Sequence, residues 1–379
     1  MPSSSSSAPS PASSSAPAQP LPSLFPFAAI AGQPQLRQAL LLAAIDPQLG
    51  GVLVEGPRGT AKSTAARALA ELIEGAPFVT LPLGASLEHL AGSLDLEQAM
   101  AGNAVRFAPG LLARAHGGVL YVDEINLLPD ALVDALLDAA ASGVNIVERD
   151  GISHHHAARF VLVGTMNPEE GQLRPQLLDR LGLCVRLHNV ADATERQAIV
   201  RARLAFDADP QAFRARHADA QADLAARLRA ARDQLQPADA LPWSDEVLTA
   251  ASDLCIAAQV DGLRADLVML RAARALAAWE GSAAVLPAHV HSVAELVLAH
   301  RRKPGTEGVS APPNAAASPP QATPSAANAE ASPSTGQPPA SDEPADWGAL
   351  LPESVGTVRM ASPAALLARD AGAPTPKKA

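Results

Sequence analysis

Short hydrophobic runs alternate with segments of helical periodicity through the first half of the sequence. We predict buried strands at residues 51–55, 78–81, 119–122, 160–164 and 183–187. Helices are expected at 63–73 and at about 130–141, because apolar residues recur there at helical spacing. Strands that alternate with helices predict a parallel sheet with helices on both faces, which is an α/β fold.

Beyond the fifth predicted strand every hydrophobic pattern is helical. We therefore place an α/β core at 25–193 and an all-helical subdomain at 194–303. Of residues 1–24, 20 are Ser, Pro or Ala, a composition that predicts a disordered tail. Residues 304–345 are again rich in Pro, Ala and Ser and are expected to form an extended linker. The remaining segment, 346–379, is a short tail that is too small to fold alone.

A loop that contains two glycines joins the first predicted strand to the first predicted helix. It reads Gly56-Pro57-Arg58-Gly59-Thr60-Ala61-Lys62-Ser63-Thr64. Backbone N–H groups in such a loop can surround phosphate oxygens, next to the positive end of the helix dipole. In this pattern Lys62 reaches the β- and γ-phosphates of a nucleotide, and the Ser63 hydroxyl is a ligand of Mg²⁺. The residues predicted to bind ATP are Gly56, Gly59, Thr60, Ala61, Lys62, Ser63 and Thr64.

One residue departs from the usual form of this loop. Ala61 stands immediately before the lysine, where the pattern normally has glycine. An alanine costs little at that place as long as its backbone φ is negative, since only a positive φ penalises a Cβ atom. The departure at Ala61 therefore weakens the motif only slightly if the local φ is negative.

Two adjacent carboxylates end the third predicted strand, Leu120-Tyr121-Val122-Asp123-Glu124, about 60 residues after the loop. Asp123 is the expected ligand of a hydrated Mg²⁺, and Glu124 is the group expected to polarise the attacking water. A strand that ends in Asp-Glu is, on its own, just as often a solvated strand end. Following a phosphate loop at this distance, it predicts a site of ATP hydrolysis.

Asn167 follows the fourth predicted strand, in the sequence Gly164-Thr165-Met166-Asn167. Ligands of open parallel sheets bind at the carboxyl ends of the strands. A side chain amide at that place can orient a water molecule against the γ-phosphate. A lone asparagine there is more often a turn residue, but the two preceding motifs favour the catalytic role.

Arginines complete the expected site, because phosphoryl transfer needs positive charge near the departing γ-phosphate. Arg180 is predicted to reach the nucleotide of a neighbouring subunit. Arg264 begins a predicted helix of the second subdomain and is expected to close on bound ATP, with Arg271 as the alternative for this role. Arg174 is a weaker candidate. Any single arginine can also be a member of a surface ion pair.

Charge and composition argue against several other classes of protein. The chain of 379 residues has a net charge of −10, whereas binding to a nucleic-acid backbone depends on clustered Lys and Arg. No run approaches the ~18 apolar residues that span a bilayer, and the N-terminus lacks the basic and apolar regions of a secretory signal. Cys184 and Cys255 lie in apolar runs without a CxxC pair, which is typical of reduced, buried thiols. We expect a cytoplasmic protein without nucleic-acid or membrane partners.

Three longer strings carry a resemblance to a known family. They are GGVLYVDEINLL at 117–128, GTMNPEEG at 164–171 and LRPQLLDR at 173–180. In this order, with the phosphate loop before them, they resemble the ATPase subunit (I subunit) of magnesium chelatase and its cobalt-chelatase-associated relatives, which are AAA+ ATPases. The resemblance covers about 25–303. It implies a P-loop NTPase core, a helical lid, and family inserts at about 84–110 and 143–160.

The resemblance also implies an assembly and a pathway. Members of the family form rings, here expected to be hexamers, with ATP at each subunit interface. They work beside a von Willebrand A-type subunit and a large tetrapyrrole-binding subunit, and hydrolysis drives insertion of Mg²⁺ into protoporphyrin IX or of Co²⁺ into a corrin precursor. No Asp-x-Ser-x-Ser string follows the linker, so the von Willebrand partner is expected to be a separate chain.

Other interpretations stay open at this point. A MoxR-like AAA+ chaperone, which also remodels a von Willebrand partner, shares the motor parts and is the main alternative. A ring helicase is disfavoured, because 143–160 offers only Arg149 and Arg159 to phosphates. A non-catalytic ring scaffold would show no ATP turnover. The run 154–156 is three histidines, which could hold a metal, but neighbouring side chains on a strand point to opposite faces.

Overall fold

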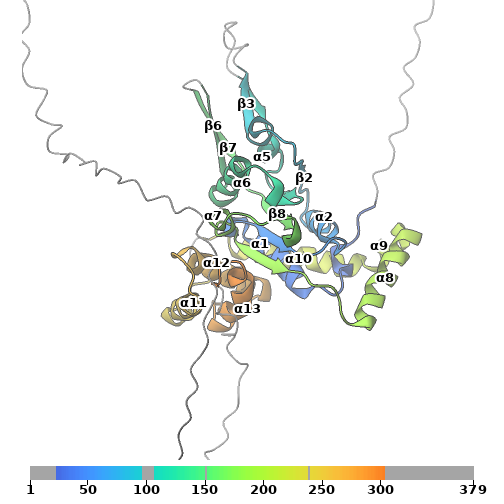
Figure 1. The fold of residues 1–379 in the computed structure, drawn as a ribbon. Coiled ribbons are helices and arrows are strands. Elements are labelled where there is room, and N and C mark those ends of the chain that lie inside the picture. Colours follow the sequence, from blue (N-terminus) through green and yellow to red (C-terminus); the bar gives the residue numbers. More distant parts are fainter. Residues whose placement is uncertain (1–22, 96–105, 150–151, 238–239, 304–379) are drawn as a thin grey trace, which may run out of the picture. The chain divides into compact units, whose positions relative to one another are not determined.

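Five short apolar strands pair into one parallel sheet (Figure 1). The computed structural model describes residues 23–95, 106–149, 152–237 and 240–303. The strands of this sheet are β1 (Val52–Glu55), β2 (Phe78–Leu81), β5 (Val119–Val122), β8 (Val161–Met166) and β9 (Leu183–Arg186). Their spatial order is β2-β5-β8-β1-β9, and every neighbouring pair is parallel. All the predicted strands therefore form, although β8 extends two residues further than expected, to Met166.

Helices cover both faces of the sheet. Side chains alternate between the two faces along each strand, and in β1 both sets are buried. Val52 and Val54 pack into one hydrophobic cluster and Leu53 into the other. The first cluster contains α1 (Pro34–Ile45) and α2 (Lys62–Leu72). The second contains α3 (Leu87–Ala91), α5 (Leu111–Arg114), α6 (Asp130–Ser142) and α7 (Pro175–Leu178). This is the expected α/β architecture.

Two β-hairpin segments lie side by side beyond this sheet (Figure 1). They are β3 (Gly92–Asp95) with β4 (Arg106–Pro109), and β6 (Val144–Arg149) with β7 (Ile152–Ala157). They occupy the positions of the two expected inserts; residues 96–105 and 150–151 lie outside the described part.

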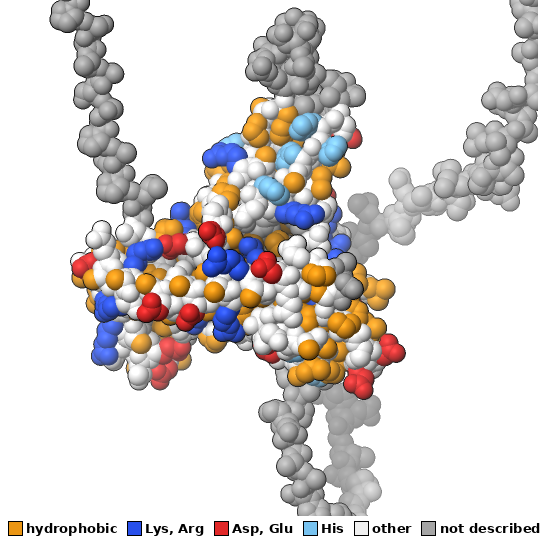
Figure 2. Space-filling view, turned by 180° about the vertical axis from the view of Figure 1, so that it is seen from behind, with side chains coloured by type: hydrophobic (Ala, Val, Ile, Leu, Met, Phe, Trp, Pro, Cys, Tyr) orange, Lys and Arg blue, Asp and Glu red, His pale blue; other side chains and the backbone are white. Residues whose placement is uncertain are grey.

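An aromatic contact joins the two hairpins. The Phe107 ring stacks on His154 at 4.2 Å between ring centroids, and His156 lies 5.2 Å from the same ring. Figure 2 shows the histidines of this region gathered beside hydrophobic side chains. Within the described residues no group of three His, Cys, Asp or Glu side chains is arranged to hold a metal. His154 and His156 thus pack against an aromatic ring, in agreement with the alternation expected for neighbouring residues on a strand.

The rest of the described chain is helical. Its elements are α8 (Ala193–Ala208), α9 (Pro210–Arg216), α10 (Ala218–Gln234), α11 (Asp245–Ala257), α12 (Arg264–Glu280) and α13 (Pro287–Leu298). The Asp192 and Asp209 carboxylates accept bonds from the first turns of α8 and α9, which fixes where these helices begin. Apolar side chains of α10 to α13 share the hydrophobic cluster of α1 and α2. None of the helices that the structure describes is long and apolar enough to cross a bilayer.

One buried arginine bonds the end of the helical region to the sheet. The side chain of Arg301 is only 2% exposed. Its Nε donates to the Asp179 carboxylate, and its two terminal nitrogens donate to the carbonyl oxygens of residues 179, 181, 182 and 297. All five N–H donors of the guanidinium are therefore used. This network holds the chain just after α13 against the segment that leads into β9.

We expect Arg301→Ala to lower the free energy of unfolding by about 3–5 kcal/mol, because it leaves a carboxylate and several buried carbonyl groups without their donor. Urea denaturation of both proteins measures this difference. Arg302→Ala is the matched control, since Arg302 forms an ion pair with the half-exposed Glu295. Its cost should be about 1 kcal/mol or less. Equal losses for the two variants would contradict a structural role for the Arg301 network.

Candidate functional site

The loop between β1 and α2 has a shape that depends on its glycines. Gly56 has φ +150°, and a Cβ atom there would lie 2.8 Å from the carbonyl oxygen of Leu187. Only glycine permits this close approach of the loop to the end of β9. Gly59 has φ +81°, with no atom within 4 Å of the place where a Cβ would stand. The backbone at Gly59 is therefore open to a ligand.

Ala61 does not meet the condition under which an alanine costs little at this place. Its φ is +59° and its ψ is 26°, which is the left-handed region. Ala61 caps the N-terminus of α2, and the chain has to reverse its twist there to leave the loop and enter the helix. An alanine in this conformation costs about 1–2 kcal/mol. Glycine, the usual residue at this place, would avoid that cost.

Lys62 is held at the carboxyl ends of two central strands. Its Nζ donates to the carbonyl oxygen of Gly56 at 2.6 Å and to that of Met166 at 3.4 Å. Burial lowers the pKa of the Lys62 ammonium, and the nearby carboxylates Asp123, Glu124 and Glu170 oppose that shift. The Lys62 ammonium, at the first turn of α2, therefore lies near three carboxylates.

Asp123 is fixed by two hydroxyl groups. Tyr121 Oη donates to Asp123 Oδ1 at 2.9 Å, and Thr165 Oγ1 donates to the same oxygen at 2.7 Å. Burial raises the pKa of the Tyr121 hydroxyl to about 12, so it remains a donor at neutral pH. In the described part of the chain Oδ2 receives no hydrogen bond, which leaves this oxygen available as a metal ligand.

Glu124 follows in a strained conformation, with φ +51°. Its backbone N–H donates to Thr165 Oγ1 at 3.1 Å, so a single hydroxyl holds both acidic residues. Its carboxylate lies 3.6 Å from Arg58, which also forms an ion pair with Glu170. Strain of this kind in a polar site is typical of functional positions.

Asn167 continues directly from β8. It is 8% exposed, and its Oδ1 accepts a bond from the backbone N–H of Glu169 at 3.4 Å. Asn167 thus begins a short 3-10 helix, as a turn residue would, and at the same time lies beside the acidic pair at the sheet's carboxyl edge.

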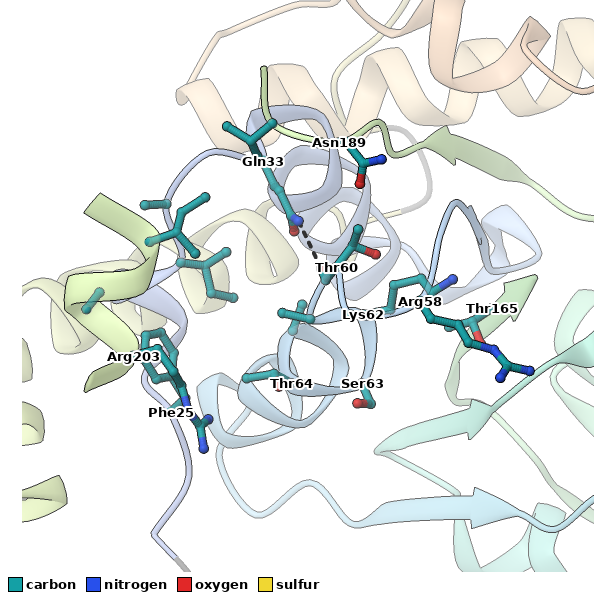
Figure 3. A pocket seen from close by; sticks show the side chains of 18 of the residues that line it. Phe25, Gln33, Arg58, Thr60, Lys62, Ser63, Thr64, Thr165, Asn189 and Arg203 are labelled. Carbon is teal, nitrogen blue, oxygen red and sulfur yellow. Dashed lines mark hydrogen bonds between the residues drawn. The ribbon is translucent and has the colours of Figure 1, made fainter. Parts of the chain in front are cut away.

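These residues surround one cavity of about 790 Å³ (Figure 3). Of the predicted ATP and catalytic residues, its lining contains Gly59, Thr60, Ala61, Lys62, Ser63, Thr64, Asp123, Glu124 and Asn167. Gly56 lies directly beneath, where its carbonyl binds Lys62. The fold thus brings residues of three separate motifs to one cavity.

Several lining residues were missed by the sequence analysis. Gln33 donates from Nε2 to the Thr60 carbonyl at 2.9 Å, so α1 supports the loop (Figure 3). Phe25 and Arg203 lie together at another side of the cavity, where α8 contributes Arg196, Ile199, Val200, Ala202, Arg203 and Leu204. No local motif marks these positions. Tyr121 and Thr165 do lie within the motif strings. The signal available for them was a hydroxyl residue near the end of each of two strands that carry the site.

The four candidate arginines all lie outside the lining of this cavity. Arg180 and Arg174 pair with carboxylates of α6. Arg264 begins α12, as expected, but pairs with Asp179 at 3.1 Å. Arg271 donates to the carbonyl oxygen of Gln48. In this conformation neither Arg264 nor Arg271 closes on the phosphate loop of its own chain.

Comparison with known proteins agrees with this geometry. Residues 51–181 match the model of the AAA domain (dynein-related subfamily), and residues 248–322 match that of the AAA lid domain. The magnesium-chelatase 38 kDa subunit of Cereibacter sphaeroides is 47% identical over 309 residues, which are 73% of this chain and 92% of the relative. The chain belongs to the magnesium-chelatase family of AAA+ ATPases.

Two further matches concern a longer protein and a more distant structure. An uncharacterized protein of Mycobacterium tuberculosis is 55% identical over 285 residues, which are 74% of this chain but only 45% of that longer protein. The solved structure of a putative ATPase from Cytophaga hutchinsonii is 19% identical, covers 73% of this chain and 84% of its own, and has a TM-score of 0.53. The latter similarity concerns the AAA+ fold alone.

For this magnesium-chelatase family ATPase we expect Glu124→Gln to bind ATP normally and to hydrolyse it on the order of 10²–10⁴-fold more slowly. Glutamine keeps the shape of the side chain but cannot take a proton from water. Nucleotide titration and steady-state turnover separate the two effects. Glu169→Gln, a change to an exposed carboxylate nearby, is the control and should turn over normally. An unchanged kcat in Glu124→Gln would make Glu124 only a strand-end carboxylate.

Proposed function

We propose that this ATPase is the motor subunit of a metal chelatase, in which ATP hydrolysis drives insertion of Mg²⁺ into protoporphyrin IX or of Co²⁺ into a corrin precursor. The observation that carries the proposal is the convergence of Lys62, Asp123, Glu124 and Asn167 on one cavity, in a chain whose relatives are named as magnesium-chelatase subunits. The metal that is inserted is cargo of the complex, separate from the Mg²⁺ that accompanies ATP.

The loop is suited to hold the nucleotide. Amides of residues 59–64 would surround the phosphates at the N-terminus of α2, where the helix dipole favours anions. Lys62, partly buried near three carboxylates, would exchange its carbonyl partners for the β- and γ-phosphates. Ser63 and the unbonded Oδ2 of Asp123 fit an Mg²⁺ ion, which when bound neutralises charge on the phosphates.

Hydrolysis is assigned to groups on both sides of a subunit interface. Glu124 would accept a proton from the attacking water, and Asn167 would orient that water. Arg180, which does not line the cavity of its own chain, would serve the nucleotide of the next subunit. Arg264, at the start of α12, would close on bound ATP when the lid moves. This division of labour supports a homo-oligomeric ring, which we propose is a hexamer.

The partners follow from the same proposal. A separate von Willebrand A-domain subunit would receive the conformational change, and a large subunit would bind the tetrapyrrole. We propose a cytoplasmic complex that binds neither nucleic acid nor membrane. The chain carries a net charge of −10, which favours these protein partners over a polyanion.

Reconstitution with the cognate von Willebrand and large subunits tests the function. We expect ATP-dependent metalation, followed by the absorbance of the tetrapyrrole, with either Mg²⁺ and protoporphyrin IX or Co²⁺ and a corrin precursor. The Glu124→Gln variant should abolish it. If ATP turnover responds to the von Willebrand subunit while neither metal is inserted, a MoxR-like chaperone replaces the chelatase motor.

A further inference from the structure

Helix α6 presents a row of acidic side chains opposite its buried face. Asp130, Asp134 and Asp138 are spaced four residues apart, so they form one stripe along the helix. The other face is anchored in the core, with Val133 and Leu136 fully buried. The carboxylates therefore stand on a rigid support.

Two arginines from the segment before β9 meet this stripe. Arg174 pairs with Asp130 at 2.7 Å. Arg180 meets two carboxylates: its Nη1 donates to Asp134, and its Nη2 donates to Asp138 at 2.6 Å. The two arginines line a small cleft of about 280 Å³ together with Asp130 and Asp134.

The two carboxylates hold the Nη1–Nη2 end of the Arg180 guanidinium and leave its Nε–Nη2 side free. Asp134 and Asp138 each take one hydrogen from the two terminal nitrogens. No described residue accepts a bond from Nε, and the side chain is 29% exposed. The Nε–Nη2 side of the planar fork is therefore available for two parallel bonds to a phosphate.

We propose that Asp134 and Asp138 are positioning residues for Arg180: they fix the Nη1–Nη2 end of its guanidinium so that the free Nε–Nη2 side faces the γ-phosphate of the neighbouring chain. This inference rests on the proposed function, since it takes Arg180 as the arginine that acts across the interface. A long, flexible side chain held by a single contact would occupy many rotamers. Two carboxylates from one helix restrict it to the orientation that hydrolysis uses.

The test begins with the double variant Asp134→Asn, Asp138→Asn, which keeps the size of both side chains and removes their charges. We expect kcat for ATP hydrolysis in the assembled ring to fall on the order of 10- to 100-fold, as for a misplaced catalytic group. KM for ATP should stay unchanged, because the loop that binds ATP is intact. Glu74→Gln, which weakens the surface pair with Arg229, is the matched control and should keep full turnover.

The decisive comparison repeats the double variant in an Arg180→Ala background. If the two aspartates act only through Arg180, adding them should lower kcat no further. A merely structural role would lower kcat or the melting temperature equally in both backgrounds, and that result would overturn the inference. An unchanged kcat in the double variant alone would also overturn it.

Asp130→Asn separates Arg180 from its neighbour Arg174. We expect a much smaller effect than that of the double variant, since Asp130 contacts Arg174 instead. An equal loss would show that the whole stripe acts without regard to Arg180, against the inference. If Arg180→Ala itself keeps normal turnover, the proposed arginine assignment fails together with the inference. If it loses turnover and the double variant does not, only the inference fails.

Discussion

Lys62→Ala should reduce ATP hydrolysis by on the order of 10³-fold and weaken nucleotide binding. The ammonium group is held at the carboxyl ends of β1 and β8 by two carbonyl oxygens, at the point where phosphates would meet the first turn of α2. Removing it takes away the ammonium that would meet the β- and γ-phosphates, together with a positive charge near Asp123 and Glu124.

Arg67→Ala is the matched control for this change. Arg67 lies on the same helix, but its guanidinium packs over the Phe78 ring, 4.6 Å from the ring centroid. Its loss removes an equal charge from α2 and should leave turnover intact. Binding measured with a fluorescent ATP analogue, alongside phosphate release, separates affinity from catalysis. Tight binding with normal turnover in Lys62→Ala would refute the assignment of the phosphate loop.

Arg180→Ala should act across the subunit interface. Its own phosphate loop is complete, so each chain should bind ATP nearly as the unaltered protein does. Turnover should nevertheless fall by on the order of 10³-fold or more, the effect of losing an arginine finger. The reason is visible in the single chain, where Arg180 lies against α6 and outside the cavity that Lys62 lines.

Mixing Arg180→Ala with Lys62→Ala gives the stringent form of this test. Each variant is inactive alone, but a mixed ring contains interfaces that pair an intact loop from one chain with an intact arginine from the other. Activity should therefore return on mixing. If co-assembly is demonstrated and the mixtures stay inactive, Arg180 does not act in trans and the ring mechanism proposed here is wrong.

Local patterns were sufficient for most of the core. The strands β2 and β5 have the bounds expected from their apolar runs. For β5 the reason is that a strand buried on both faces leaves an uninterrupted hydrophobic string. Lys62 and Asp123 could be assigned because their chemistry depends on neighbours in sequence. Because the strands are parallel neighbours in one sheet, their carboxyl ends lie side by side, and the residues at these ends come together without any further motif.

Other features depend on distant parts of the chain and could not be predicted in this way. The hydroxyl of Thr165 acquires a role only because β8 pairs with β5, and Gln33 only because α1 packs beside the loop. The positive φ of Ala61 reflects how the loop enters α2, which the residue type alone did not indicate. Arg180 and Arg264 are held by ion pairs that motif spacing does not reveal.

The helical region is attached to the sheet differently at its two ends, at α13 and at α8, because of the Arg301 network. Four hydrogen bonds from one buried guanidinium join the chain after α13 to residues 179–182, so this junction cannot slide or pivot without breaking several of them together. Residues 187–192, which lead from β9 to α8, have no such fastening and are largely exposed. The chain just after α13 is therefore bonded directly to the segment that carries Arg180, so a displacement of that end of the helical region would be passed on to this segment.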